Sequence, residues 1–274
     1  MRLLNVGCGP TYHPAWVNMD AEPAAREVIR YDARRPLPFE DGCFDACYSS
    51  HLLEHLSQEE ALSFLRGARR VLKPGGVLRV VVPDLERVVA GYMKELELVL
   101  HAPPGTGSAV YDWSVVELLD QMVRDKSGGR MGEFLKECPP SMRGTVTSRI
   151  GLEAEGFWAQ ERNRRSGLCR LIMSSPGFLV DKCRLVLLTA LGWLIGGKRG
   201  VAAVRQGWFR TSGEVHRWMY DRYSLARLLE EAGFRDVALC DARASRIDGF
   251  ACYQLDVTAG AVRKPDSLFM EGVR

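Results

Sequence analysis

The sequence predicts an α/β fold in which a mostly parallel sheet of seven strands is interrupted by an inserted, mainly helical cap. Over residues 1–92, apolar runs of strand length alternate with a helical pattern and short polar connectors. The same alternation resumes after residue 214. The roughly 120 residues between these halves break the alternation and are too many for an ordinary connector. Alternating strands and helices with short connectors are typical of parallel sheets covered by helices.

Four short strands are expected in the first half, at Leu3–Val6, Trp16–Met19, Val28–Tyr31 and Phe44–Ser49. A helix is expected over Glu59–Leu72, because its apolar residues recur at the spacing of one helical face. Lys73-Pro74-Gly75-Gly76 ends this helix, since proline and glycine favour a turn there. The β-branched run Val77–Val82 then predicts a strand buried on both faces.

The second half predicts one helix and two strands. The helix covers Ser224–Ala232 and ends at Gly233, with its leucines on one face. The strands are expected at Val237–Cys240 and Phe250–Val257, separated by a polar loop. Together these elements would complete the seven-stranded sheet.

Composition narrows the class of protein. At 274 residues, of which 46% are hydrophobic, the chain suits one large domain or a domain with an inserted subdomain. The net charge of +3 is too small to indicate a nucleic-acid partner. The eight cysteines lack the paired spacing of a zinc site, so we expect reduced thiols in a cytoplasmic protein. A strand begins almost at the first residue, without a signal-peptide pattern.

The insert, residues 93–213, has its own charge character. Residues 143–210 hold twelve Lys or Arg and four Asp or Glu, so the rest of the chain is net acidic. Within this basic stretch lies the apolar run Leu185–Gly196, which is too short to span a bilayer. One interpretation is a buried helix of the cap. The other is an interfacial helix, through which residues 178–199 contact an anionic membrane at its inner surface or a lipid-linked substrate.

A glycine loop and a carboxylate mark the start of the chain. Gly7-Cys8-Gly9 directly follows the first strand, and Asp20 ends the second. In nucleotide-binding α/β folds such glycines let the backbone approach a ligand, and the acid accepts hydrogen bonds from ribose hydroxyls. Only ten residues separate Gly9 from Asp20, so the usual helix between these strands is missing or reduced to a loop.

Several further motifs, in the right order and spacing, carry a family resemblance. Gly7-Cys8-Gly9, Asp20 and Asp32 are accompanied by LPFEDGCFD at 37–45, SHLLEHL at 50–56 and RVLKPGG at 70–76. Together they resemble the class I S-adenosylmethionine-dependent methyltransferases of the type 11 kind. The tail, with HRWMYD at 216–221 and RKPDSLFME at 263–271, resembles a narrower bacterial branch associated with surface-glycan genes. The resemblance implies a Rossmann-like domain over 1–92 and 214–274, with 93–213 as the inserted cap and acceptor-binding region.

The resemblance implies S-adenosylmethionine as the cofactor. It implies that Gly7 and Gly9 line the methionine part, that Asp20 holds the ribose hydroxyls, and that Asp32 approaches the adenine amino group. Ser49 and Ser50 end the fourth strand, where this fold places its ligand-facing loops, and are expected in the same site.

Methyl transfer from a sulfonium mainly requires alignment, and it needs a base only when the acceptor is a hydroxyl or a protonated amine. His51 and His216 are the candidate bases, because histidine titrates near neutrality. For His216, capping of the following helix is the alternative. The candidates for contact with the acceptor are Asp84, Tyr92, Trp218 and Tyr220.

The spacing of His51 and His55 also invites a metal interpretation, because residues four apart share a helix face. The position of Glu54 does not fit a zinc-protease pattern, and no third ligand supports one. We therefore expect no metal, and structural roles for Glu54 and His55.

The sequence thus predicts methyl transfer to a small-molecule or saccharide acceptor, lipid-linked or phosphorylated in view of the basic insert. The alternative is a non-catalytic methyltransferase-like scaffold that binds a membrane or protein partner through its cap. A nicotinamide-dependent oxidoreductase is disfavoured, because the Gly-x-Gly-x-x-Gly spacing and its phosphate-binding helix are absent.

Overall fold

The apolar runs near the N-terminus form the centre of a seven-stranded sheet in the computed structural model, which describes residues 1–103, 109–163 and 176–274. The sheet order is β3-β2-β1-β4-β5-β9-β6. The strands are β1 (Leu3–Val6), β2 (Trp16–Asp20), β3 (Ile29–Arg30), β4 (Phe44–Ser50), β5 (Leu72–Pro83), β6 (Arg235–Cys240) and β9 (Ser267–Val273). Neighbouring strands are parallel except β9, which is antiparallel to both β5 and β6. The predicted mostly parallel sheet is confirmed.

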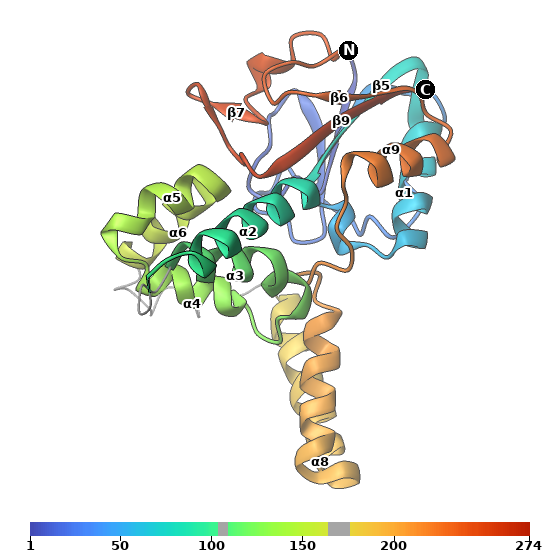
Figure 1. Ribbon diagram of the computed structural model, residues 1–274. Coiled ribbons are helices and arrows are strands. Elements are labelled where there is room, and N and C mark those ends of the chain that lie inside the picture. The colour runs from blue at the N-terminus through green and yellow to red at the C-terminus, as the bar shows by residue number, and fades with distance from the viewer. Residues whose placement is uncertain (104–108, 164–175) are drawn as a thin grey trace.

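Two helices cover one face of the sheet (Figure 1). In α1 (Gln58–Val71), the Ser57 hydroxyl accepts a hydrogen bond from Glu60 N, and the Glu60 carboxylate accepts one from Ser57 N. This reciprocal capping fixes the first turn. The start of α9 (Arg222–Glu231) is capped in the same way by Asp221. Both helices bury their apolar faces in one core cluster with the inner strands.

The opposite face is covered by irregular chain between β6 and β9. This segment contains a 3-10 helix at Phe250–Tyr253 and a small hairpin of β7 (Val257–Thr258) and β8 (Ala261–Val262). It packs against Trp16 and Tyr48 in a second core cluster. Residues 7–15, between β1 and β2, form no helix, as the short spacing predicted.

The predicted strand at Phe250–Val257 is wrong. Gly249 and Gln254 have φ values of 66° and 53°, which break an extended chain at both ends of the 3-10 helix. Phe250 and Leu255 bury their side chains against the sheet without joining it. The remaining strand of the sheet is β9, and it enters between β5 and β6.

The insert is helical in its described residues. It comprises α2 (Leu85–Leu100), α3 (Ala109–Val123), α4 (Gly129–Glu137), α5 (Pro140–Ile150), α6 (Leu152–Asn163) and α8 (Pro176–Arg210). Helix α2 begins directly after β5 and crosses the predicted boundary at residue 92, so the exact division of the domains stays a prediction. Trp113, Leu135 and Val146 centre a separate core cluster of the insert.

Helix α8 is a hairpin that projects away from the rest of the protein (Figure 1). Gly197, at φ 55° and ψ −138°, breaks the helix into two arms. The expectation that Leu185–Gly196 is a buried cap helix is wrong, because Leu194 is 75% and Ile195 87% exposed. Among the described residues, Lys182–Arg210 is long and apolar enough to cross a membrane by length and composition alone.

Seven cysteines are free thiols, and Cys169 lies outside the described residues.

Candidate functional site

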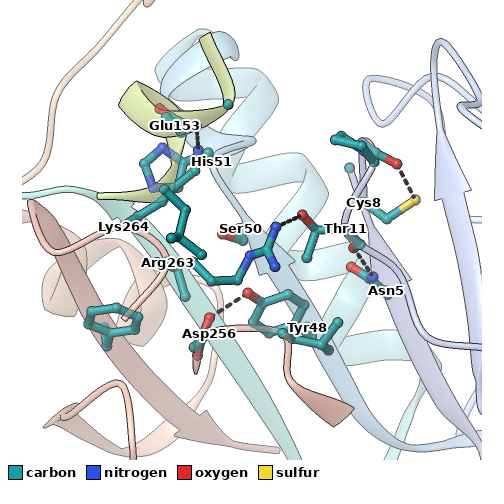
Figure 2. A pocket seen from close by; sticks show the side chains of 18 of the residues that line it. Asn5, Cys8, Thr11, Tyr48, Ser50, His51, Glu153, Asp256, Arg263 and Lys264 are labelled. Carbon is teal, nitrogen blue, oxygen red and sulfur yellow. Dashed lines mark hydrogen bonds and ion pairs between the residues drawn. The ribbon is translucent and has the colours of Figure 1, made fainter. Parts of the chain in front are cut away.

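A cavity of about 510 Å³ lies at the carboxyl ends of β1 and β4. Its walls are the loop after β1, the segment 255–264 and helix α6 of the insert (Figure 2). This volume lies within the range of pockets that hold small molecules. The lining residues are Asn5, Gly7, Cys8, Gly9, Pro10, Thr11, Tyr48, Ser50, His51, Val81, Leu152, Glu153, Gly156, Phe157, Gln160, Leu255, Asp256, Arg263, Lys264 and Phe269.

The loop after β1 has the geometry that its glycines predict. Gly7 and Gly9 have φ values of 73° and 52°, in the left-handed region that glycine adopts without strain. A Cβ at Gly7 would lie 3.1 Å from the Leu52 side chain, whereas the space beside Gly9 is open. Gly7 N donates to Met19 O at 2.8 Å, which ties the loop to β2.

Asp20 holds this loop from the end of β2. Its Oδ2 accepts a hydrogen bond from Gly9 N at 2.8 Å, and its Oδ1 accepts one from Glu22 N at 2.8 Å. Each carboxylate oxygen has a second lone pair, so Asp20 keeps the capacity to accept from a ribose hydroxyl. Asp20 supports the cavity's glycine loop without lining the cavity itself.

The other predicted cofactor residues lie at different depths. Asp32 pairs with Arg34, and the hydrogen bond from that guanidinium lowers the pKa of the Asp32 carboxyl. Ser50 lines the cavity, but Ser49 is buried and its hydroxyl has no hydrogen-bond partner within the part of the chain that the structure describes. Gly7, Gly9 and Ser50 therefore line the cavity, whereas Asp20, Asp32 and Ser49 do not.

A polar wall, formed by Tyr48, Asp256, Arg263 and Lys264, completes the lining of the cavity. The Tyr48 hydroxyl donates to Asp256 Oδ1 at 2.5 Å, and Arg263 Nη2 donates to Thr11 Oγ1 at 2.8 Å (Figure 2). The second of these bonds links the segment before β9 to the glycine loop. Lys264 Nζ lies 2.6 Å from Glu153 Oε1, an ion pair between that segment and helix α6.

His51 stands at the end of β4 in an unusual backbone conformation. Its φ is 52°, which for a non-glycine residue is uncommon and is often found at functional sites. Its Nδ1 lies 3.1 Å from Oε1 of the fully buried Glu54, and its Nε2 lies 2.9 Å from Ser267 Oγ. Burial by itself would raise the pKa of Glu54, but His51 and the neighbouring histidines outweigh it and lower the pKa to about 2. Glu54 is therefore an ionised carboxylate within ion-pair distance of His51, and its buried oxygens have no hydrogen-bond partner among the described residues.

His216 lies close to Glu54 and is not among the residues that line the cavity. It is buried, and burial lowers its pKa to about 3 although Glu54 opposes the shift. Its ring packs edge-to-face on His55 at 4.8 Å between centroids. His216 is therefore a neutral, buried imidazole beside Glu54 and His55.

Donor atoms of Glu54, His55 and His216 lie within 4.8 Å of one another. Among the described residues, this is the one group of three such ligands. The metal interpretation from the sequence considered His51 and His55 and did not include His216. Ligand atoms at 2.0–2.1 Å from a tetrahedral zinc would be roughly 3.3 Å apart. That the protein holds no metal stays a prediction.

The four candidate acceptor residues lie outside the cavity lining. Asp84 caps α2 by accepting from Arg87 N, and Tyr92 packs on Tyr111. Trp218 N donates to Glu54 O at 3.2 Å. Tyr220 is buried, and burial followed by Glu54 raises its pKa to about 12.

Sequence reasoning missed most of the polar wall. Tyr48 and Asp256 belong to no motif quoted above, Arg263 and Lys264 were given no role in the site, and Glu153 comes from the insert. The signal that could have found some of them is the pair Arg263-Lys264 just before the last apolar run, quoted above only as part of the tail's resemblance.

The sheet order, its single antiparallel strand and the glycine loop at the end of β1 define a Rossmann-like fold of the methyltransferase type. A family described as methyltransferase domain matches residues 4–80. Residues 4–80 therefore match the domain of the class I S-adenosylmethionine-dependent methyltransferases, a family whose methyl donor is S-adenosylmethionine. No curated protein matches the chain.

Solved methyltransferase structures are similar in part. An S-adenosylmethionine-dependent methyltransferase from Archaeoglobus fulgidus is 11% identical over 100% of this chain and 86% of its own, with a TM-score of 0.39. One from Thermotoga maritima is 12% identical over 99% and 81%, with a TM-score of 0.37. One from Mesorhizobium loti is 20% identical over 32% and 49%, with a TM-score of 0.25. The chain spans 38%, 50% and 49% of the length of three solved chains that it matches. TM-scores below 0.5 support no shared substrate.

The site is compatible with S-adenosylmethionine on its own geometry. Gly9 leaves open space where a side chain would stand, and Asp20 retains acceptor capacity beside it. Arg263 brings a guanidinium to the same loop, where it suits the carboxylate of the cofactor's amino-acid part. Gly7, Gly9, Asp20 and Arg263 are the residues that would hold the cofactor.

Proposed function

We propose that this protein transfers a methyl group from S-adenosylmethionine to a hydroxyl of a polar, saccharide-like acceptor, with His51 as the base. The observation that carries the proposal is the arrangement of His51 between Glu54 and the cavity. Its Nδ1 faces the buried carboxylate at 3.1 Å, and the residue itself lines the cavity opposite the glycine loop.

Glu54 determines which nitrogen of His51 carries the proton. A buried carboxylate at Nδ1 favours the tautomer with hydrogen on Nδ1, so Nε2 is left with its lone pair. The Ser267 hydroxyl, 2.9 Å from Nε2, is then the donor to that lone pair. An acceptor hydroxyl that replaces Ser267 at Nε2 would give its proton to His51.

When bound, S-adenosylmethionine supplies an electrophilic methyl carbon, whose bond to sulfur breaks as the acceptor oxygen bonds to it. His51 takes the acceptor's proton, and Glu54 stabilises the imidazolium that forms. Arg263 and the glycine loop hold one side of the cavity, while α6 closes another. These residues supply alignment, which is the main requirement of an in-line displacement.

The cavity wall favours a hydroxyl-rich acceptor. Asp256, Gln160 and Lys264 offer both acceptors and donors of hydrogen bonds, while Phe157 and Phe269 offer aromatic faces. A sugar ring presents hydroxyls at its edge and C–H groups on its face, so it suits both kinds of wall. Lys264 also suits a phosphorylated acceptor.

The first test is calorimetric titration with S-adenosylmethionine and S-adenosylhomocysteine, followed by transfer of a labelled methyl group to a panel of saccharides and phosphosaccharides. His51→Gln should lower turnover by about 10²–10⁴-fold and leave cofactor affinity unchanged. His101→Gln, at an exposed site, is the matched control. Failure to bind either cofactor form would reject the proposal, and full turnover by His51→Gln would reject the base.

A further inference from the structure

Helix α8 is apolar where it meets solvent. On its first arm Leu187, Leu188, Leu191, Leu194 and Ile195 recur at the spacing of one helical face. All five are exposed, and Trp193 adds a large aromatic ring on another side. The most apolar 18-residue window of this hairpin has no buried residue. Monomeric soluble proteins rarely expose a contiguous apolar surface of this kind.

The two arms pack through small residues. A Cβ added to Gly192 would lie 2.9 Å from Gly200 O and 2.9 Å from Val204 Cγ2, and one added to Gly200 would overlap Gly192 O. Glycine therefore permits the close approach of the arms, while the large apolar side chains point outward. Water-soluble hairpins place their large apolar side chains between the helices. Small residues inside and large residues outside are typical of helices that pack in lipid.

The charge of the hairpin complements an anionic surface. By sequence, residues 176–210 contain six Lys or Arg and one Asp or Glu. The exposed Lys198 and Arg199 follow the turn at Gly197, so basic groups stand at the far end of the apolar arm. Lys182 and Arg184 stand at its near end. Basic residues that bracket an apolar helix are attracted to anionic lipid headgroups.

From these three observations we infer that the α8 hairpin docks on an anionic lipid bilayer and lies in its headgroup interface. The break at Gly197 leaves an apolar run, Leu185–Gly196, of about 18 Å at 1.5 Å per residue, against a hydrocarbon core of about 30 Å. Lys198 and Arg199 at the turn would be costly at the bilayer centre, whereas in the interface they reach the headgroups. Docking of the hairpin does not require methyl transfer.

The test is sedimentation of the full chain with unilamellar vesicles. The wild type is expected to bind vesicles of equal parts phosphatidylcholine and phosphatidylglycerol, and to bind phosphatidylcholine alone at least tenfold more weakly. Leu194→Glu combined with Ile195→Glu should lower the partition coefficient at least tenfold. Lys198→Glu combined with Arg199→Glu should remove the preference for phosphatidylglycerol.

The matched control is Leu98→Glu combined with Leu100→Glu, two exposed leucines of α2 outside the hairpin. This control should bind vesicles like the wild type. Unchanged thermal unfolding and cofactor affinity would show that each variant is folded, and these readouts also separate this inference from the proposed function.

Two results would overturn the inference. One is equal binding of the wild type and the Leu194/Ile195 variant to the anionic vesicles. The other is a concentration-dependent dimer in light scattering that the same variant abolishes, together with no vesicle binding, because a second copy of the chain would then cover the hairpin.

Discussion

Arg79 Nε donates to Asp256 Oδ2 at 2.7 Å, and this buried pair fastens the cavity wall to the middle of the sheet. Arg79 lies on β5, and Asp256 lies in the irregular segment between β6 and β9. The same guanidinium donates to Glu271 Oε1 at 2.9 Å and stacks over Phe250 at 4.8 Å. Asp256 in turn accepts from the Tyr48 hydroxyl in the cavity.

Arg79→Met should destabilise the protein by about 3–5 kcal/mol, because it leaves the buried carboxylates of Asp256 and Glu271 without their cation. Urea denaturation followed by circular dichroism measures the effect. Arg26→Met, at an exposed arginine, should change stability by less than about 0.5 kcal/mol. Equal stability of the two variants would show that the buried pair is dispensable.

Gly151→Ala should disrupt the cavity through the insert. Gly151 joins α5 to α6 at φ 62° and ψ −136°, and a Cβ there would overlap Arg263 O and lie 2.5 Å from Pro265 Cδ. Helix α6 would have to move away from the segment that carries Arg263 and Lys264, and both line the cavity. The KM for the acceptor should therefore rise at least tenfold. Steady-state kinetics measure this change, with an acceptor taken from the panel of saccharides and phosphosaccharides.

Gly144→Ala is the matched control for Gly151→Ala. Gly144 lies inside α5, and a Cβ there meets nothing within 4 Å. Alanine is favoured over glycine in a helix by about 0.5–1 kcal/mol, so this variant should be slightly stabilised with unchanged KM. If both variants behave alike, the close contact at Gly151 does not position α6.

Asp20→Ala should weaken S-adenosylmethionine binding by tenfold or more, about 1.4 kcal/mol. The substitution removes both a ribose acceptor and the hydrogen bond that holds Gly9 N. Isothermal calorimetry measures the dissociation constant, with the exposed Asp248→Ala as the control. Unchanged affinity would assign Asp20 a role in the loop alone.

His216 should make the protein sensitive to mild acid. Its pKa is about 3 in the folded protein, against an ordinary value near 6.5, so the unfolded chain binds a proton that the folded chain excludes. Its contribution to stability is complete above pH 6.5 and is lost as the pH falls from 6.5 towards 3. Between pH 7 and pH 5 the loss should reach roughly 2 kcal/mol.

His216→Gln should reduce that loss, and the exposed His101→Gln should preserve it. Urea denaturation at pH 7, 6 and 5 gives the three free energies for each protein. The same slope with pH in the His216→Gln variant as in the wild type would mean that His216 does not titrate on unfolding.

The sequence predicted the elements whose pattern is local. Leu3–Val6 is a strand with the predicted bounds, and α1 lies within one residue of its predicted bounds, because apolar periodicity and capping act over short distances. Phe250–Val257 failed because its apolar residues pack on the face of the sheet and do not pair with a strand. Periodicity does not distinguish these two forms of burial.

The sequence predicted only those residues of the candidate site that belong to its motifs. Gly7, Gly9, Ser50 and His51 line the cavity, and all four belong to the motifs near the N-terminus. Asp256 and Arg263 reach it from more than 200 residues away along the chain, by contacts with Tyr48 and Thr11 that no single sequence reveals. The apolar run of α8 likewise indicates a surface to be covered but not what covers it.

The position of β9 has a consequence for the order of events during synthesis. This strand is the last in sequence, yet it lies between β5 and β6 and carries Phe269 into the cavity. During synthesis on the ribosome, β5 therefore has only β4 as a neighbour until the whole insert and β9 have been made. Helix α8 is synthesised before Phe269 of β9 completes the cavity lining. A hairpin that docks on lipid would therefore be available to the membrane before the first turnover.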